Sequence, residues 1–265
     1  LIDVEGARPT PETFRRALFL ARRRATQRLQ DVAAFYIVSL SADSIGYKGM
    51  VLPARLPQLY PDLQRADLES SVAVFHQRFS TNTTSRWSLA QPFCKHTPTG
   101  EINTIAGNRA WAQARAHVWR SEHLDPREFD PVIEVDGSDS QSLDAMLDLL
   151  EAGGMDALKA MRILVPPATQ SLEYKDADLA AFYEYYALNS EPWDGPAGIV
   201  LFDGRYAACT LDRNGLRPAR WQLTSDRHFL IASEAGVGDV PATEIVRNGT
   251  LVPGHMIAAA LRTAE

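Results

Sequence analysis

Three short polar segments carry the side chains best suited to chemistry, and each lies where a strand is predicted to end or a helix to begin. They are His76–Asn82 (HQRFSTN), Gly100–Asn103 (GEIN) and Gly137–Ser140 (GSDS). Arg78 and Asp139 together suit a zwitterion, because a guanidinium grips an α-carboxylate through two hydrogen bonds and a carboxylate receives an α-ammonium. An ordinary ion pair between the two residues is the simpler explanation. Both alternatives stay open on residue types alone.

Motifs for metals and nucleotides are missing from the sequence. No P-loop, GxGxxG, HExxH or GxSxG pattern occurs. The two cysteines, Cys94 and Cys209, lie far apart and have no metal-ligand spacing. We therefore expect no bound metal, no disulfide framework and a reducing compartment.

The composition is that of a mildly acidic globular protein. The 265 residues include 27 Lys and Arg against 33 Asp and Glu, which gives a formal charge of −6. This balance argues against nucleic-acid binding, which favours a basic surface. No apolar run reaches the roughly 18 residues that span a bilayer, and the opening residues lack the basic start of a signal peptide. We expect one large cytoplasmic domain with no membrane or nucleic-acid partner.

Helices and strands are predicted in partly separate parts of the chain. The first helix should begin at Thr10-Pro11-Glu12, since a capping hydroxyl precedes a proline and an acid, and further helices are expected after Asn103, from Asp139 and over Asp176–Asn189. This segregation is typical of an α+β fold with an antiparallel sheet. Strands are predicted at Ala33–Leu40, Ser44–Met50, Ser71–Phe79, Gly198–Phe202, Arg205–Leu211, Leu216–Leu223, His228–Ser233 and Met256–Leu261, with hairpin turns at Asp203-Gly204 and Asn214-Gly215.

The first predicted helix has an apolar stripe and a run of arginines. The apolar positions recur at steps of three and four residues, which indicates one buried face. The arginines then form either a partner surface or, more simply, a solvated face. The stripe is Phe14, Leu18, Ala21, Ala25 and Leu29, and the arginines are Arg15, Arg16, Arg22, Arg23 and Arg28.

Several longer motifs resemble the glutamine amidotransferase domain of the glutamate synthase large subunit. The resemblance runs from about Pro11 to Ile257. Arg-x-Ser-Thr and Asn-Gly-x-Arg-Pro elements recur in other class II amidotransferases, whereas EPWDGPA and YKGM point more narrowly to glutamate synthase. The matching segments are His76–Thr83, Gly100–Thr104, Gly137–Ser140, Glu191–Ala197, Leu211–Pro218 and Tyr47–Met50.

The resemblance implies an α+β fold of the N-terminal-nucleophile hydrolase type, an αββα sandwich of two antiparallel sheets between helical layers. It implies that residues 1–265 form a type 2 glutamine amidotransferase (glutaminase) domain and correspond to the later two-thirds of the family domain. The implied reaction is hydrolysis of L-glutamine to glutamate and ammonia. The family sends this ammonia through an internal tunnel to 2-oxoglutarate, which is converted to glutamate.

The resemblance also implies roles for particular residues. Arg78 would bind the α-carboxylate of glutamine with help from Thr81, and Asp139 would bind its α-ammonium. The backbone N–H of Gly100 would be one oxyanion donor, and Thr99 stands where the family has the Asn that supplies the other. No cofactor is expected on these residues. FMN and an iron–sulfur cluster are implied for the intact enzyme, together with a synthase domain of the same polypeptide and a small electron-donating subunit.

Two departures from the family pattern bear on activity. The family begins with a nucleophilic Cys whose own α-amino group is the general base, whereas this sequence starts at Leu1 and its cysteines are internal. We expect the nucleophile to lie upstream of these residues. In addition, Cys94, Pro98 and Thr99 stand where the family has Arg, His and Asn. Because Thr is shorter and losing one oxyanion donor costs about 10² to 10³ in turnover, we predict a weakened or silent glutaminase site.

Two other functions remain open alternatives. One is a catalytically silent amidotransferase-like domain that binds glutamine or a partner chain. The other is a class II amidotransferase that passes its ammonia to a different acceptor.

Overall fold

A four-stranded antiparallel sheet lies at the centre of the computed structural model, which describes residues 9–32, 35–79, 83–129, 131–134, 136–168 and 176–261. Its strand order is β1-β2-β3-β7, so β1 is an edge strand among these residues. Gly100 at the end of β1 pairs with Ala197 at the start of β2. The strands are β1 (His96–Gly100), β2 (Ala197–Phe202), β3 (Tyr206–Leu211) and β7 (Met256–Ala260).

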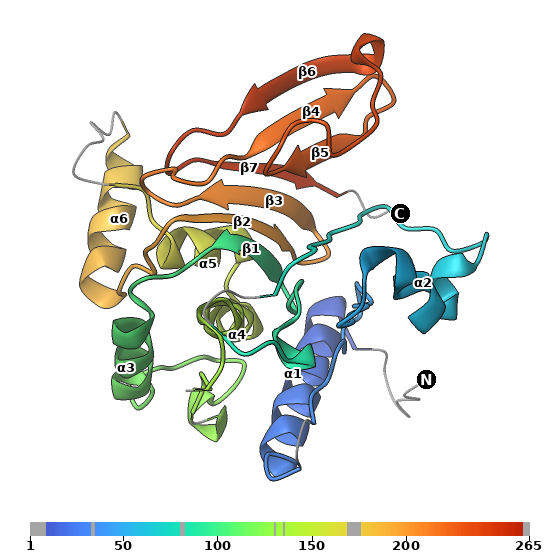
Figure 1. The fold of residues 1–265 in the computed structure, drawn as a ribbon. Coiled ribbons are helices and arrows are strands. Elements are labelled where there is room, and N and C mark those ends of the chain that lie inside the picture. The colour runs from blue at the N-terminus through green and yellow to red at the C-terminus, as the bar shows by residue number, and fades with distance from the viewer. Residues whose placement is uncertain are drawn as a thin grey trace.

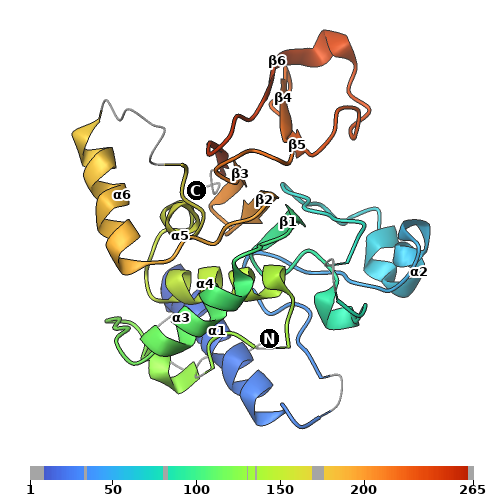
Figure 2. The same ribbon diagram turned by 60° about the vertical axis from the view of Figure 1, so that its left-hand side comes forward.

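Helices lie on one side of this sheet (Figures 1 and 2). The core forms where α4 and α5 meet the sheet, with Leu143, Leu147, Met161, Ile199 and Leu201 all almost fully buried. Each such side chain contributes roughly 1.5 to 3 kcal/mol through loss of contact with water. The helices are α1 (Pro11–Arg28), α3 (Ile105–Arg115), α4 (Asp139–Ala152), α5 (Ala157–Leu164) and α6 (Ala177–Asn189).

A second, three-stranded antiparallel sheet of order β5-β4-β6 lies beyond β7, on the side away from the helices (Figure 1). Its strands are β4 (Arg220–Thr224), β5 (Phe229–Ala232) and β6 (Ile245–Thr250). Short helical turns complete the described structure, at Pro53–Arg55, Leu56–Leu59 (α2), Pro61–Gln64, Trp87–Leu89, Pro126–Phe129 and Ala242–Glu244.

The predicted α+β class with antiparallel sheets is confirmed. The predicted helix starts also hold: Thr10 Oγ1 accepts a hydrogen bond from the N–H of Thr13, and Ser138 caps α4. The Asp203-Gly204 turn joins the paired strands β2 and β3. The Asn214-Gly215 hairpin is wrong, because β3 and β4 belong to different sheets.

The three strands predicted early in the chain are wrong wherever the structure describes them. Residues 35–40, 44–50 and 71–78 form no strand, and Phe79 makes only an isolated bridge to Ala90. Strand propensity needs a neighbouring backbone to become a strand, and these segments have none among the described residues. The sequence pattern conversely missed β1 and β6, which are rich in polar residues.

Most of the predicted α1 arginines bond to other parts of the chain rather than forming one solvated face, although Arg28 is exposed. Arg22 pairs with Asp148 of α4, and Arg16 donates to the carbonyl of Ala152 at the end of α4, at 3.0 Å. Arg23 donates to three carbonyls between Phe129 and Val132. Carbonyls at a helix end favour a cation, so these arginines hold α1 against α4.

The predicted apolar stripe of α1 is accordingly only partly right. Leu18 and Phe19 are the buried residues of the helix, whereas Ala21 and Leu29 are exposed.

Asp144 of α4 holds the first residues of β1. Its carboxylate accepts hydrogen bonds from the backbone N–H groups of Cys94, Lys95 and His96, at 2.8 to 3.1 Å, and from Nδ1 of His96 at 2.8 Å. Burial opposes ionisation of Asp144, but the hydrogen bonds from His96 and Lys95 outweigh it and lower its pKa. This anchor fixes the start of the edge strand to the helical layer.

Glu151, near the end of α4, is buried beside Lys95. Its Oε2 lies 3.2 Å from Nζ of Lys95. Burial raises the pKa of Glu151 to about 7, although Lys95 acts in the opposite direction and Asp148 adds to the increase. The carboxylate therefore titrates near neutral pH in the folded protein.

Replacing Glu151 by Gln should change how stability depends on pH. The folded-state pKa of about 7 lies above the ordinary value of 4.5, so the contribution of Glu151 to stability is complete below pH 4.5 and falls as the pH rises to 7. Between pH 5 and 8, the free energy of unfolding of the wild type should fall by about 2.5 kcal/mol relative to Glu151→Gln. Urea unfolding at successive pH values measures this difference. Glu122→Gln, at an exposed position, is the control, and parallel curves for Glu151→Gln and wild type would contradict the assignment.

Candidate functional site

The end of β1 and the EPWDGPA segment (Glu191–Ala197) approach each other so closely that only glycine fits at two positions. Gly100 has a φ of +130°, and a Cβ there would lie 1.8 Å from the carbonyl oxygen of Pro196. A Cβ on Gly195 would lie 2.0 Å from the carbonyl oxygen of Glu101. Two glycines in separate motifs are therefore required by one backbone contact.

Hydrogen bonds continue this contact beyond the glycines. Thr104 and Asp194 exchange two of them, one from the N–H of Thr104 to the Asp194 carbonyl at 3.2 Å and one from the N–H of Asp194 to Oγ1 of Thr104 at 2.9 Å. The buried Asn108 accepts from the Thr104 hydroxyl at 2.6 Å and donates to the carbonyl of Pro192 at 3.1 Å. The GEIN segment and the EPWDGPA segment thus form one rigid unit.

Asp139, the first residue of α4, attaches the GSDS segment to the same unit. Its Oδ2 accepts a hydrogen bond from the N–H of Ile102 at 2.7 Å, and its Oδ1 accepts from the N–H of Ser140 at 2.7 Å. The side chain is only half-buried. A carboxylate at this position retains lone pairs for a cation, in addition to those that accept these two hydrogen bonds.

Arg109 of α3 fixes the loop that carries Asp139. Its Nη2 donates to the carbonyls of Gly137 and Ser138, at 2.5 and 3.1 Å, and to Oγ of Ser142 at 2.9 Å. The sequence motifs did not indicate this residue. The signal was an arginine one turn into the helix that follows GEIN, where a guanidinium can reach the carbonyls of a neighbouring loop.

Asp212 stabilises the turn after β3. This buried carboxylate accepts hydrogen bonds from the N–H of Ala197 at 3.1 Å, Asn214 at 2.9 Å and Gly215 at 3.1 Å. The turn is thereby fixed to the first residue of β2. Arg213 in the same turn forms an ion pair with Asp194.

Arg78 is exposed, and no ion pair joins it to Asp139 in the part of the chain that the structure describes. Its N–H donates to Nδ1 of His76 at 2.9 Å, a ring whose pKa is lowered by burial. The structural ion pair weighed as the simpler explanation is therefore not formed. Thr81 lies outside the described residues. Arg86 links the chain that follows to the loop before Asp139, because its Nη2 donates to the carbonyl of Asp136 at 2.9 Å.

Thr99 and Gly100 lie together at the end of β1. Thr99 is half-buried, opposite Gly198 of β2, and its hydroxyl makes no hydrogen bond to any described residue. Among the described residues β1 is an edge strand, a position that tolerates Pro98. Cys94 contacts Arg22, and burial raises the pKa of its thiol to about 12. That thiol is not a thiolate near neutral pH, so Cys94 is a packing residue.

The described residues offer neither a metal site nor a membrane-spanning helix. Within the described ranges, no group of three or more His, Cys, Asp or Glu side chains is placed to hold a metal ion. An iron–sulfur cluster takes four cysteine thiolates, and this sequence has only two cysteines, so its residues do not fit such a cluster. No described helix combines the length and the apolar character needed to cross a membrane.

Curated proteins similar to this chain are much longer than it is. A ferredoxin-dependent glutamate synthase of Pyropia yezoensis is 45% identical over 228 residues, covering 84% of this chain and 15% of that protein. The glutamate synthase [NADPH] large chain of Azospirillum brasilense is 40% identical over 260 residues, which cover 96% of this chain and 17% of that protein. The glutamate synthase [NADH] of Saccharomyces cerevisiae is 41% identical over 257 residues, which cover 95% of this chain and 12% of that protein. The chain thus spans about one-eighth to one-sixth of these relatives.

One solved structure resembles the fold at a distance. It is the glutamine phosphoribosylpyrophosphate amidotransferase from B. subtilis, with a TM-score of 0.38 and 14% identity over 69% of this chain and 31% of that one. This likeness is too low to assign a role to any residue.

The family of the chain follows from its sequence. Residues 2–265 match the family described as class-II glutamine amidotransferases. With nearly the whole sequence matched, the chain belongs to the class-II glutamine amidotransferases.

Proposed function

We propose that this chain is the later two-thirds of a glutaminase domain and supplies the glutamine site of a glutamate synthase. The observation that carries the proposal is the 2.7 Å hydrogen bond from the N–H of Ile102 to Asp139. It sets a carboxylate beside Gly100, so a group that binds an α-ammonium lies next to a backbone donor. Relatives named glutamate synthase at 40 to 45% identity support the same reaction.

The chemistry assigns a separate task to each residue. Asp139 binds the α-ammonium of glutamine, and Arg78, with Thr81, binds its α-carboxylate. A Cys thiolate from upstream of these residues attacks the side-chain amide, and the N–H of Gly100 stabilises the oxyanion, with Thr99 as the second donor. Ammonia leaves, and water hydrolyses the thioester to glutamate.

Synthesis of glutamate from this ammonia needs parts outside the 265 residues. We place FMN and the iron–sulfur cluster in a synthase domain of the same polypeptide, where 2-oxoglutarate is the ammonia acceptor. A small electron-donating subunit and a cytoplasmic location complete the proposal. Ammonia release from glutamine by the intact polypeptide, with and without 2-oxoglutarate, tests it.

One observation favours a second function, a glutamine-binding domain without catalysis. Thr99 is shorter than the Asn expected at its position, and its hydroxyl makes no hydrogen bond to a described residue that would orient it. Glutamine binding without measurable ammonia release would support this second function over the first.

Asp139→Asn in the intact polypeptide should weaken glutamine binding. Losing a charged partner of the α-ammonium costs roughly 1.5 to 3 kcal/mol, so the KM for glutamine should rise about 10- to 150-fold with little change in kcat. The KM for glutaramate, which lacks the α-amino group, should stay unchanged. Steady-state ammonia release measures both constants, with exposed Asp178→Asn as the control. An equal rise in KM for both substrates would show that Asp139 does not bind the α-ammonium.

Arg109→Met should act on the same substrate group through the loop that Arg109 holds. Without the guanidinium, the carbonyls of Gly137 and Ser138 lose their donor and Asp139 is less well positioned. We expect a raised KM for glutamine, an unchanged KM for glutaramate, and a loss of about 2 kcal/mol in stability by urea unfolding. Arg109→Lys, which keeps the charge without the fork, should be intermediate. A fall in stability with both KM values unchanged would limit Arg109 to a structural role.

Thr99→Asn should raise turnover by supplying an amide donor that reaches the oxyanion. The kcat should rise by at most about 10² to 10³, the effect of gaining one whole oxyanion donor, and by less to the extent that the Thr99 hydroxyl already donates. Thr99→Val, which removes the hydroxyl at nearly constant volume, shows whether the threonine already donates. Single-turnover ammonia release measures both variants. Equal kcat values for wild type, Thr99→Asn and Thr99→Val would rule out position 99 as an oxyanion donor.

A further inference from the structure

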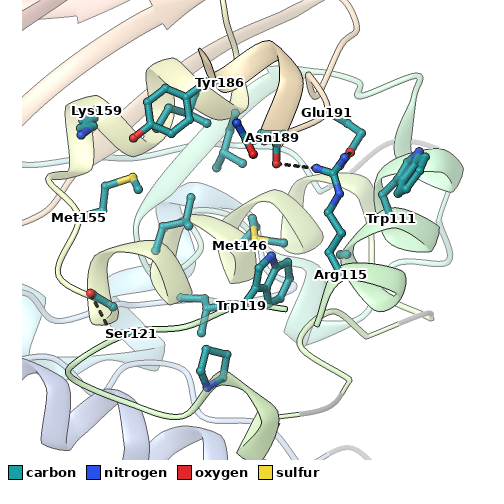
Figure 3. Close-up of a pocket in the computed structure, with 18 of the residues that line it drawn as sticks. Trp111, Arg115, Trp119, Ser121, Met146, Met155, Lys159, Tyr186, Asn189 and Glu191 are labelled. Atoms are coloured by element: carbon teal, nitrogen blue, oxygen red, sulfur yellow. Dashed lines mark hydrogen bonds and ion pairs between the residues drawn. The ribbon is translucent and has the colours of Figure 1, made fainter. Parts of the chain in front are cut away.

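A cavity of about 540 Å³ lies between α3, α4, α5 and α6, and the proposed glutaminase chemistry does not use it (Figure 3). Neither Asp139 nor Gly100 lines it. The buried side chains of Asn108 and Trp193 form part of its wall and separate it from the GEIN segment. Cavities of this volume are typical of sites for small organic molecules.

Five aromatic and two methionine side chains line the cavity, together with aliphatic and polar ones. Trp119, Met146, Met155 and Tyr186 surround it, and Trp111 lies at its rim with 49% of its surface exposed (Figure 3). Methionine and aromatic side chains adapt to flat ligands and contribute large contact areas. This lining favours a planar aromatic ligand over a sugar or an aliphatic amine.

One side of the cavity is rigid. Arg115 stacks over Trp111, with its guanidinium carbon 4.9 Å from the ring centroid, and donates to the carbonyl of Asn189 at 2.6 Å. It also forms an ion pair with Glu191. These contacts tie α3 to the end of α6, so the aromatic wall is in place before any ligand binds.

The charges at the cavity favour an anion. Both acids that line it are already engaged, Glu191 by Arg115 and Asp156 by Arg205 at 3.6 Å. Arg120 donates only to backbone carbonyls, and Lys159 lies 5.6 Å from the ring centroid of Tyr186. Within the described ranges, neither cation has a carboxylate within 4 Å.

We propose that this cavity binds a planar aromatic anion, with the ring against Trp111, Trp119 and Tyr186 and the negative group at Lys159 and Arg120. The aromatic lining selects the ring, and the two unpaired cations select the charge. The site is independent of glutamine hydrolysis, so it stands or falls separately from the glutaminase proposal.

Three probes with the same ring and different charge test the proposal on the intact polypeptide. They are 2-naphthoate, neutral 2-naphthamide and cationic 2-naphthylmethylammonium, and binding is measured by titration calorimetry. The expected result is a dissociation constant of roughly 1 mM or tighter for naphthoate. Naphthamide should bind about tenfold more weakly and the cation more weakly still. Absence of naphthoate binding, as when another part of the polypeptide or a second copy covers the cavity, would overturn the proposal.

Substitutions at the cavity test whether the probes bind there. Lys159→Gln combined with Arg120→Gln should reduce naphthoate affinity to that of naphthamide, and Trp111→Ala should weaken all three probes. Arg24→Gln combined with Arg28→Gln removes the same two charges from exposed positions of α1 and should change nothing. A preference for the anion that survives in the Lys159 and Arg120 variant, or that is lost in the α1 control, would overturn the assignment.

Discussion

The close backbone contact between Gly100 and Pro196 is the constraint on which the rest of the site depends. No side chain larger than hydrogen fits at Gly100, since a Cβ there would lie 1.8 Å from the Pro196 carbonyl. Because these two segments of the chain touch, the N–H groups of Glu101 and Thr104 hydrogen-bond directly to the EPWDGPA segment. The N–H of Ile102 then faces Asp139 across a short hydrogen bond. Three motifs that are distant in sequence therefore share one rigid geometry.

The acids of α4 organise what lies around this contact. Asp139 holds the chain after β1, Asp144 holds the residues at its start, and Asp148 and Glu151 take Arg22 and Lys95. Each carboxylate reaches a partner far away in sequence and is at least half-buried, where charge-assisted hydrogen bonds are strong. The helix therefore aligns β1 along its length as well as burying the leucines of the core.

The sequence predicted α1, α3, α4, α6 and most of the later strands, because capping residues and glycine turns are local signals, but it missed α5 and β6. Prediction from sequence failed where the secondary structure of a segment depends on partners far away in the chain. Residues 71–78 alternate like a strand and stay irregular, while β1 contains a proline and polar residues yet pairs with β2. Asp139 was recognisable from its motif. Arg109 was not, because its partners are carbonyls about 30 residues away, and its position one turn into the helix after GEIN was the only local signal.

The same geometry explains how the departures at Pro98 and Thr99 fit into the fold. Both residues lie between two anchors, Asp144 at the start of β1 and the Gly100 contact at its end. The backbone path is therefore set by groups other than their side chains. An edge strand also accepts a proline without losing its sheet. A change from Asn to Thr at position 99 consequently leaves the backbone N–H of Gly100 in place and alters only the side-chain donor. In the proposed oxyanion site, Thr99 would therefore change the side-chain donor without changing the backbone path.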